Sequence, residues 1–200
     1  DTERNHLRLL KHGDPDGQYW VPAMADTPLR GANGRHEWFW EPGDETAVYS
    51  LNALVNKYYN SVGRNATLIL GVTPDPNGLI PVEDSVRLQE FGQAIQQLLG
   101  YPLKTTAGQK KQLDLKLPQI TKVNQCVIQE DIRQGERIRK YKVEAKVDGK
   151  WQIVCEGESV GHKRIQRFEP VQTNQLRLIV LQAKDVPQIW NFSVYSDGSF

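Results

Sequence analysis

Three aromatic side chains stand between two carboxylates in the segment HEWFWE, residues 36–41, and Arg30 lies six residues before it. Sugar sites commonly stack an aromatic ring on the apolar face of a pyranose, while arginine and carboxylate groups take its hydroxyls. Glu37 and Glu41 could alternatively form a pair of catalytic acids. Trp38 and Trp40 therefore predict a carbohydrate site, and the surrounding elements decide between binding and catalysis.

The chain has 200 residues, 38% of them apolar and 24% charged, as in a folded protein. A net charge of +1 argues against a nucleic-acid or membrane-surface partner. Residues 1–100 hold 8 basic and 13 acidic side chains, a net charge of −5, and residues 101–200 carry +6. This change of sign predicts two units with different surfaces, or two faces that meet.

No segment has the length and hydrophobicity of a membrane-spanning helix, and the first residues lack the pattern of a signal peptide. The absence of an initiator methionine fits a processed or truncated product. Cys126 and Cys155 have no neighbouring histidines, so they predict two buried free thiols and neither a metal site nor a cofactor.

The first half alternates strand-like and helix-like segments. A short apolar run at 18–24 predicts a strand, and a long loop follows it. Residues 46–62 have helical spacing, with Asp44 and Glu45 placed where carboxylates complement a helix start. The continuous apolar run at 66–72 predicts a buried parallel strand, and a second helix is expected from Val82 to Gly100.

This order corresponds to two consecutive βα units, which implies parallel strands in a larger α/β sheet or barrel. Two strands and two helices leave both sheet edges open and bury too small a core. Residues 1–100 are therefore predicted to be part of a bigger domain, whose remainder lies before Asp1 or on another chain.

The second half has a different pattern. Residues 101–111, a polar stretch with glycine, proline and lysine, predict a linker. Residues 112–200 offer seven short strand candidates with turns every 8–14 residues, and Asp148-Gly149 is the signature of a tight hairpin. These features predict an antiparallel β-sandwich.

The order of motifs in the first half resembles the end of the catalytic domain of α-L-fucosidases, glycoside hydrolase family 29. The second half resembles the discoidin-like (F5/8 type C) β-sandwich that follows the barrel in many bacterial members, with the likeness centred on Trp151, Gly157 and the GHKRI turn at 161–165. The matching motifs of the first half are Trp20 with Pro22, Trp38-Phe39-Trp40, Tyr58 to Gly63, Asn65 to Leu70, Pro74 to Gly78, and Glu90-Phe91-Gly92.

The resemblance implies the last two βα units of a (β/α)8-type barrel over residues 1–100, then the linker, then the sandwich over 112–200. It implies retaining hydrolysis of terminal α-L-fucose, which needs a carboxylate nucleophile and a carboxylic acid/base. Both would lie before Asp1, so the N-terminal part of the same protein and a fucosylated glycan are the expected partners. Met24 stands where some relatives have a glutamate, and a thioether does no acid/base work. The family suggests a periplasmic or secreted protein.

The resemblance assigns substrate contacts to the long loop. Trp38 aligns with an aromatic placed against fucose, although its ring could instead pack under the loop. Trp40 could line the outer site or pack on the following helix, and Phe39 is expected to point inward. Glu37 and Arg30 could contact sugar hydroxyls, or brace the loop by pairing with each other, which we favour.

Some alternatives remain open at this level. The protein could be a non-catalytic carbohydrate-binding protein in which the two tryptophans form a sugar platform. Asp26 could orient Arg30 or cap a turn. Asn65 and Asn191 match the glycosylation pattern, by chance in our interpretation, and the basic turn 162–164 is expected to dock on the acidic first half.

Overall fold

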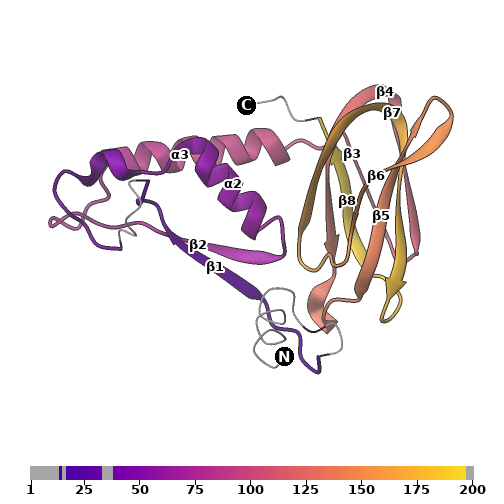
Figure 1. The fold of residues 1–200 in the computed structure, drawn as a ribbon, viewed down its shortest axis with the longest axis horizontal. Coiled ribbons are helices and arrows are strands. Elements are labelled where there is room, and N and C mark those ends of the chain that lie inside the picture. The colour runs from indigo at the N-terminus through magenta and orange to yellow at the C-terminus, as the bar shows by residue number, and fades with distance from the viewer. Residues whose placement is uncertain (1–13, 15–16, 33–37, 197–200) are drawn as a thin grey trace, which may run out of the picture.

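The computed structural model describes residue 14, residues 17–32 and residues 38–196. Figure 1 shows two parts side by side, one containing the helices and a small sheet, the other a larger β-structure. The first part holds β1 (Ala23–Pro28), the 3-10 turn η1 (Asp44–Ala47), α2 (Leu51–Ser61), β2 (Ala66–Gly71) and α3 (Val82–Leu99). The second holds β3 (Lys104–Gly108), β4 (Gln112–Glu130), the 3-10 turn η2 (Ile132–Gln134), β5 (Ile138–Val147), β6 (Lys150–Gly157), β7 (Arg164–Ala183) and β8 (Ile189–Tyr195).

The strands β1 and β2 pair in parallel, from Ala23 opposite Ala66 to Pro28 opposite Gly71. The predicted parallel pairing is confirmed, and β2 occupies the expected residues. The first strand, however, begins five residues later than the apolar run at 18–24 suggested. Tyr19 and Val21 in that run are exposed, because hydrogen bonding to β2, rather than hydrophobicity, sets the position of β1.

The first helix is shorter than predicted, and the second matches the prediction. Residues 44–47 form a separate 3-10 turn, and α2 begins only after Ser50, whose hydroxyl accepts a hydrogen bond from the Ala53 N–H at 3.3 Å. Ser50 is thus the N-cap that ends the extended segment before α2. The helix α3 spans Val82 to Leu99. No helix in the described part of the chain is long and apolar enough to cross a membrane.

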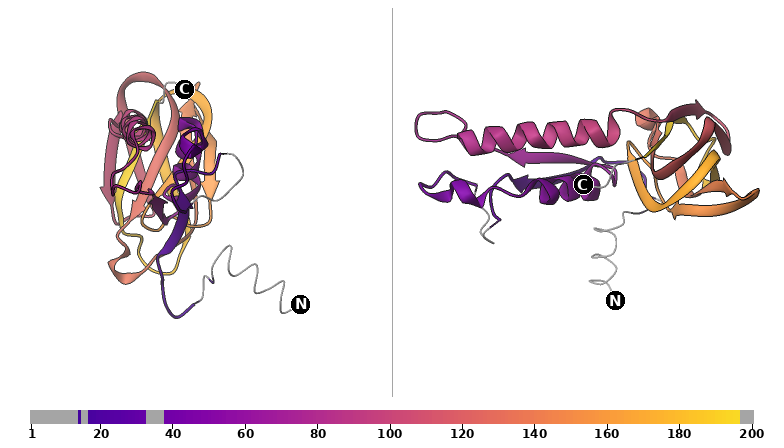
Figure 2. Two further views of the ribbon diagram at one scale, coloured as in Figure 1. Left: turned by 90° about the vertical axis from the view of Figure 1, so that its left-hand side faces the viewer. Right: turned by 90° about the horizontal axis from the view of Figure 1, so that it is seen from above.

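Both helices lie on the same side of the small sheet (Figures 1 and 2). The alternation of side chains along the strands then gives the sheet two different faces. Ala25, Thr27, Leu68 and Leu70 are half-buried, whereas the other face is exposed at Met24, Asp26, Thr67 and Ile69. Thr27 is on the helix side, because Lys57 of α2 donates a hydrogen bond to its hydroxyl at 3.1 Å.

The second part is an antiparallel sheet in the strand order β3-β8-β4-β7-β5-β6. Figures 1 and 2 show it folding over on itself, consistent with a β-sandwich. Two strands are much longer than predicted, since β4 has 19 residues and β7 has 20, and each joins two of the expected short strands. Their pairing resumes beyond an irregularity between Lys116 and Thr121, so the hydrogen-bonded ladder continues where the sequence suggested a break.

Two local features of the second part can be compared with the sequence. The hairpin at Asp148-Gly149 is confirmed, with φ angles of 50° and 77° at these residues and Val147 paired with Lys150. The stretch predicted as a linker, residues 101–111, includes β3, which pairs with β8. The polar composition of β3 suits an exposed edge strand, so composition alone could not distinguish this strand from a linker.

The two parts pack against each other through a small apolar cluster and a tight turn. The cluster contains side chains of α2, α3 and the sandwich, and the hydroxyl of Tyr59 donates to Gln125 Oε1 at 2.6 Å. Asn65, just before β2, donates its N–H to the Lys163 carbonyl at 2.9 Å and accepts from the His162 N–H at 2.6 Å. The turn 162–164 thus docks on the first half as expected, through its main-chain groups. The Asn65 side chain accepts one of these hydrogen bonds. The buried cluster residues are Tyr59, Leu98, Val127, Ile165 and Tyr195.

Candidate functional site

The candidate site lies where β1 and β2 end. Because the two strands are parallel, their carboxyl ends meet at one edge of the sheet, and the loops that follow them lie close together. Figure 1 places these loops at the end of the molecule away from the sandwich. Main-chain hydrogen bonds hold the first loop, from Leu29 N–H to the Gly71 carbonyl at 2.8 Å and from Gly31 N–H to the Ala47 carbonyl at 2.9 Å. The start of the long loop is therefore fixed against both β2 and η1.

Arg30 is buried directly after β1 and forms an ion pair with Asp84 of α3. Its Nε donates to Asp84 Oδ1 at 3.0 Å and its Nη2 donates to the same oxygen at 2.9 Å. Asp84 is in the first turn of α3, where the helix dipole also favours a carboxylate. The expected pairing of Arg30 with Glu37 lies outside the described residues, as does Glu37 itself. Among the residues described, the buried Nη1 of Arg30 has no hydrogen-bond partner.

Trp38 lies across the end of the small sheet and is 45% exposed. A Cβ atom added to Gly71, the last residue of β2, would come within 3.1 Å of Trp38 Cζ3 and 3.6 Å of the Pro28 Cα. The indole ring therefore packs directly on the main chain at the end of β2, and a side chain at position 71 would push the ring away by a few tenths of an ångström. One part of the ring is supported while the rest is free to meet a ligand.

The other aromatic residues of the loop differ from the prediction in one case. Phe39 was expected to point inward, but it is 81% exposed. Trp38 takes the position against the strand ends, and Phe39, at a bend in the chain, faces solvent. Trp40 is half-buried, which is compatible with either of the roles considered for it.

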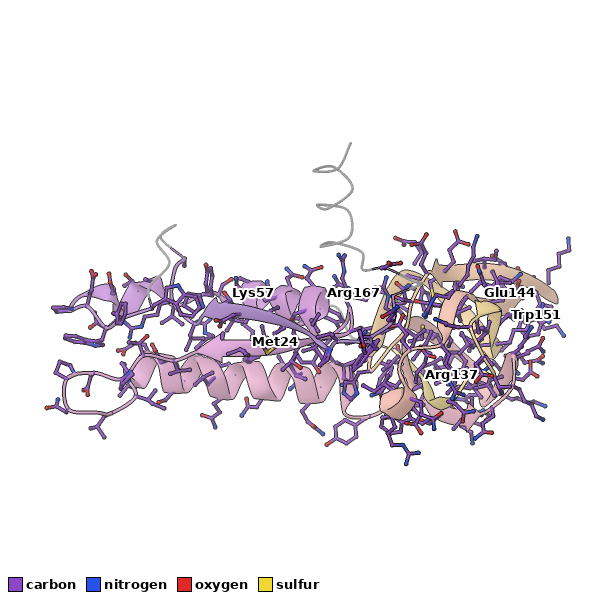
Figure 3. The ribbon with its side chains drawn as sticks, turned by 90° about the horizontal axis from the view of Figure 1, so that it is seen from below. Met24, Lys57, Arg137, Glu144, Trp151 and Arg167 are labelled. Atoms are coloured by element: carbon purple, nitrogen blue, oxygen red, sulfur yellow. The ribbon has the colours of Figure 1, made fainter. Side chains whose placement is uncertain are left out.

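The exposed face of the small sheet carries Met24 and Asp26, both on the amino-terminal side of the strand ends that form the site. Met24 is 71% exposed, and Figure 3 labels it on the side of the sheet seen from below. Asp26 is exposed on the same face, two residues along β1. Since Arg30 pairs with Asp84, the suggestion that Asp26 orients Arg30 is wrong.

The loop after β2 is a compact turn built around Asp75. The Asp75 carboxylate accepts hydrogen bonds from the N–H groups of Asn77 at 2.8 Å and Leu79 at 2.9 Å. The bond from Leu79 is the main reason that the pKa of Asp75 lies below its usual value. Gly78 has a φ of 78°, which favours glycine. This rigid turn gives the site a second fixed border.

The geometry suits binding more than bond cleavage by the described residues themselves. An indole face, a buried guanidinium and two anchored loops can hold and orient a sugar ring. The sequence predicts a carboxylate in the first turn of α3, but it does not indicate that Arg30 is the partner of Asp84. For this reason sequence reasoning missed Asp84 as part of the site. It also missed the role of Gly71, which depends on where Trp38 packs.

Comparison with known proteins links the chain to one family. A family profile described as "Alpha-L-fucosidase" matches residues 26–97. A rice protein, named as a candidate α-L-fucosidase 1 of Oryza sativa subsp. japonica, is 32% identical over 221 aligned residues. That match covers 93% of this chain and 41% of the rice protein, so the chain spans less than half the length of this relative.

Solved structures of related proteins match the fold of both parts of the chain. A candidate α-L-fucosidase from Bacteroides thetaiotaomicron VPI-5482 is 62% identical, with a TM-score of 0.94 over 97% of this chain and 45% of that one. A glycoside hydrolase 29 family member from an unknown rumen bacterium is 32% identical, with a TM-score of 0.85 over 96% and 36% of the two chains. The matched motifs and the matched fold together identify the chain as similar to part of the α-L-fucosidases of glycoside hydrolase family 29.

Proposed function

We propose that the intact protein is a retaining α-L-fucosidase that removes terminal α-L-fucose from glycans, and that this chain forms one wall of its fucose pocket. The observation that carries the proposal is the position of Trp38, half-exposed and seated on the main chain at the carboxyl ends of two parallel strands. In α/β barrels the catalytic site is built from loops at this end of the strands.

The roles of Trp38 and Arg30 follow from their surroundings, and those of Trp40 and Glu37 follow from the family resemblance. The exposed part of the Trp38 ring stacks on the apolar face of the sugar. Arg30 is buried and anchored by Asp84, so its remaining Nη1 is held to donate to a carboxylate that in turn binds a sugar hydroxyl. Trp40 lines the edge of the pocket toward the rest of the glycan, and Glu37 contacts a hydroxyl.

The bare face of the small sheet supports its assignment as part of a barrel. In a (β/α)8 barrel the helices cover the outer face of each strand, and the inner face packs against side chains from the other strands. Here the helices lie on one side, and Met24 and Ile69 are exposed on the other. We therefore assign residues 1–100 to the last two βα units of such a barrel, 101–111 to a connection that includes β3, and 112–200 to the sandwich.

The two catalytic carboxylates come from another part of the protein. A retaining mechanism needs them about 5–5.5 Å apart, one as nucleophile and the other as acid/base. Met24, whose side chain lies on the bare face, can contribute only packing. The chain's own work is to bind fucose, orient it and exclude water on one side.

The test is fucose release from an aryl α-L-fucoside by the intact protein. Replacing Trp38 with alanine should lower kcat/KM at least tenfold, about 1.4 kcal/mol of lost transition-state stabilisation. Tyr101→Ala, at an exposed aromatic residue beyond α3, should leave it unchanged. Binding of fucosides without any release would contradict the hydrolase and favour a non-catalytic binding protein. Normal release by the Trp38 variant would contradict only its place in the pocket.

A further inference from the structure

A pocket lies on the sandwich, close to the turn that docks on the first part of the chain. Its volume is about 390 Å³, and it is lined by Glu130, Asp131, Ile132, Arg133, His162 and Trp190. These residues come from the end of β4, from η2, from the turn before β7 and from the start of β8. The His162 N–H donates to Asn65, which directly precedes β2, so this pocket lies near the amino end of β2. It is therefore separate from the site at the carboxyl ends.

Trp190 is presented to this pocket by a β-bulge. Gln129 pairs with Asn191 and Glu130 pairs with Ile189, so Trp190 is an extra residue in β8 without a partner on β4. A bulge of this kind re-aims a side chain, and bulges are enriched next to functional sites. Trp190 is 55% exposed, so much of its ring is accessible to a ligand. The fold thus turns an aromatic surface outward beside polar neighbours.

The polar neighbours are planar groups with several hydrogen-bonding atoms. Arg133 is exposed, and its Nε donates to both oxygens of Asp131, at 2.9 and 3.0 Å. This contact is the main reason that the pKa of Asp131 lies at about 2, so the carboxylate is charged at every relevant pH. The pair has no net charge. Asp131 also accepts from the main-chain N–H and Nη2 of Arg133, and the Arg133 side chain, 87% exposed, keeps N–H donors that reach solvent. The exposed His162 ring adds a further donor or acceptor.

A buried carboxylate fixes the walls of the pocket relative to each other. Glu130 Oε1 accepts from the N–H groups of Arg137 at 3.1 Å and Ile138 at 3.0 Å, and Oε2 accepts from Gly161 at 3.1 Å. One side chain thereby holds the start of β5 and the turn before His162 in place. Burying a charge is costly, and here three main-chain donors offset that cost. The arrangement is preorganised, as a binding site requires.

Trp190 is exposed at the bulge, and polar side chains held in place by Glu130 lie beside it. We propose that the sandwich pocket binds a neutral pyranose unit of a glycan, away from the fucose site. The apolar face of the sugar stacks on Trp190, and adjacent hydroxyls bond to Asp131, Arg133 and His162. The Asp131 carboxylate repels an acidic sugar, and its pairing leaves Arg133 with little net attraction for one. The site would keep the protein on its glycan independently of catalysis.

The experiment measures binding of fucose-free sugars to the intact protein by ligand-observed NMR. The probes are the methyl glycosides of β-D-galactose, β-D-glucose and α-D-mannose, with glucuronic acid as the acidic comparison. At least one neutral probe should bind, and Trp190→Ala should weaken that binding at least tenfold. Ile120→Ala, at an exposed residue elsewhere on β4, should have no effect. Asp131→Asn, which keeps the shape, should also weaken binding.

Different outcomes separate this site from the fucose pocket. Trp190→Ala should leave the hydrolysis of an aryl α-L-fucoside unchanged. The sugar-binding measurement is informative even if the intact protein does not hydrolyse the fucoside. The proposal is overturned if no neutral probe binds the intact protein, if only glucuronic acid binds, or if a folded Trp190 variant binds as well as the original. Thermal unfolding of each variant establishes that it is folded.

Discussion

The two parts of the molecule bury their apolar residues to different extents. In the sandwich, Ile128, Tyr141 and Phe192 are fully buried in one continuous core. In the small sheet, Met24 and Ile69 are 71% and 42% exposed, although β2 is as apolar in sequence as any strand of the sandwich. Figure 1 shows the cause, since the large sheet folds over on itself whereas the small one has helices on a single side.

This difference shows that the burial of a strand's side chains depends on whether both faces of its sheet are covered, and not on the hydrophobicity of the strand alone. The run Leu68-Ile69-Leu70 has the pattern of a strand covered on both faces, and only one face is covered by described residues. An apolar face of this kind usually meets another surface. The sandwich has a continuous core of its own, whereas one face of the small sheet is left uncovered by the described residues. Four predictions test or refine this contrast, beginning with the largest expected effect.

The strongest single tie within the first part is the buried ion pair between Arg30 and Asp84. Replacing Asp84 with alanine leaves a guanidinium buried without its partner, which typically costs about 3–5 kcal/mol. The control is Glu90→Ala, which breaks the exposed pair with Arg87 and should cost at most about 1 kcal/mol. Urea unfolding measures both. Equal losses in the two variants would contradict the structural role of the buried pair.

The contrast in burial predicts unequal costs for the same substitution. Ile128→Ala in the sandwich removes a fully buried side chain and should lower the free energy of unfolding by about 2–5 kcal/mol. Ile69→Ala in β2 should cost less than about 1 kcal/mol in this chain, because the side chain is partly exposed. In the intact protein the cost at Ile69 should rise toward that at Ile128 if another part covers the sheet. An unchanged small cost there would argue against the barrel assignment.

The contact between the two parts depends on Gly161. Its φ is 60°, and an added Cβ would lie 2.1 Å from Asn65 Nδ2. Gly149 is the matched control, since its φ is 77° and no atom lies within 4 Å of an added Cβ. Alanine at Gly149 should cost about 1–2 kcal/mol from the left-handed backbone alone. At Gly161 the loss of the Asn65 hydrogen bonds adds about 1 kcal/mol for each bond, and calorimetry should resolve two separate unfolding transitions.

The smallest expected effect is a pH dependence from Glu130. Burial raises its pKa in the folded protein above the ordinary value of 4.5. The folded state then keeps a proton that the unfolded state has released, so stability falls as the pH rises from 4.5 through the raised folded pKa. Glu130→Gln, which has no proton to lose, should flatten this fall in unfolding measured from pH 4 to 8. A wild-type stability that rose relative to the variant over this window would contradict the assignment.

Much of the local structure could be predicted from the sequence. The strand at 66–71, the helix from Val82 and the Asp148-Gly149 hairpin follow from apolar runs, helical spacing and turn chemistry, which are properties of neighbouring residues. The parallel pairing of the two strands could be inferred from their order. The position of β1 could not, because its hydrogen-bonding partner lies more than forty residues away along the chain.

The sequence by itself determined that two βα units precede an all-β part, and that Trp38 and Arg30 follow the first strand of the small sheet. Only the tertiary structure decided that Arg30 pairs with Asp84, that Trp38 rests on Gly71 while Phe39 faces outward, and that a bulge exposes Trp190. Each of these contacts joins residues distant in sequence, and each depends on how whole elements pack. Local patterns specify which elements form, whereas packing specifies which side chains meet.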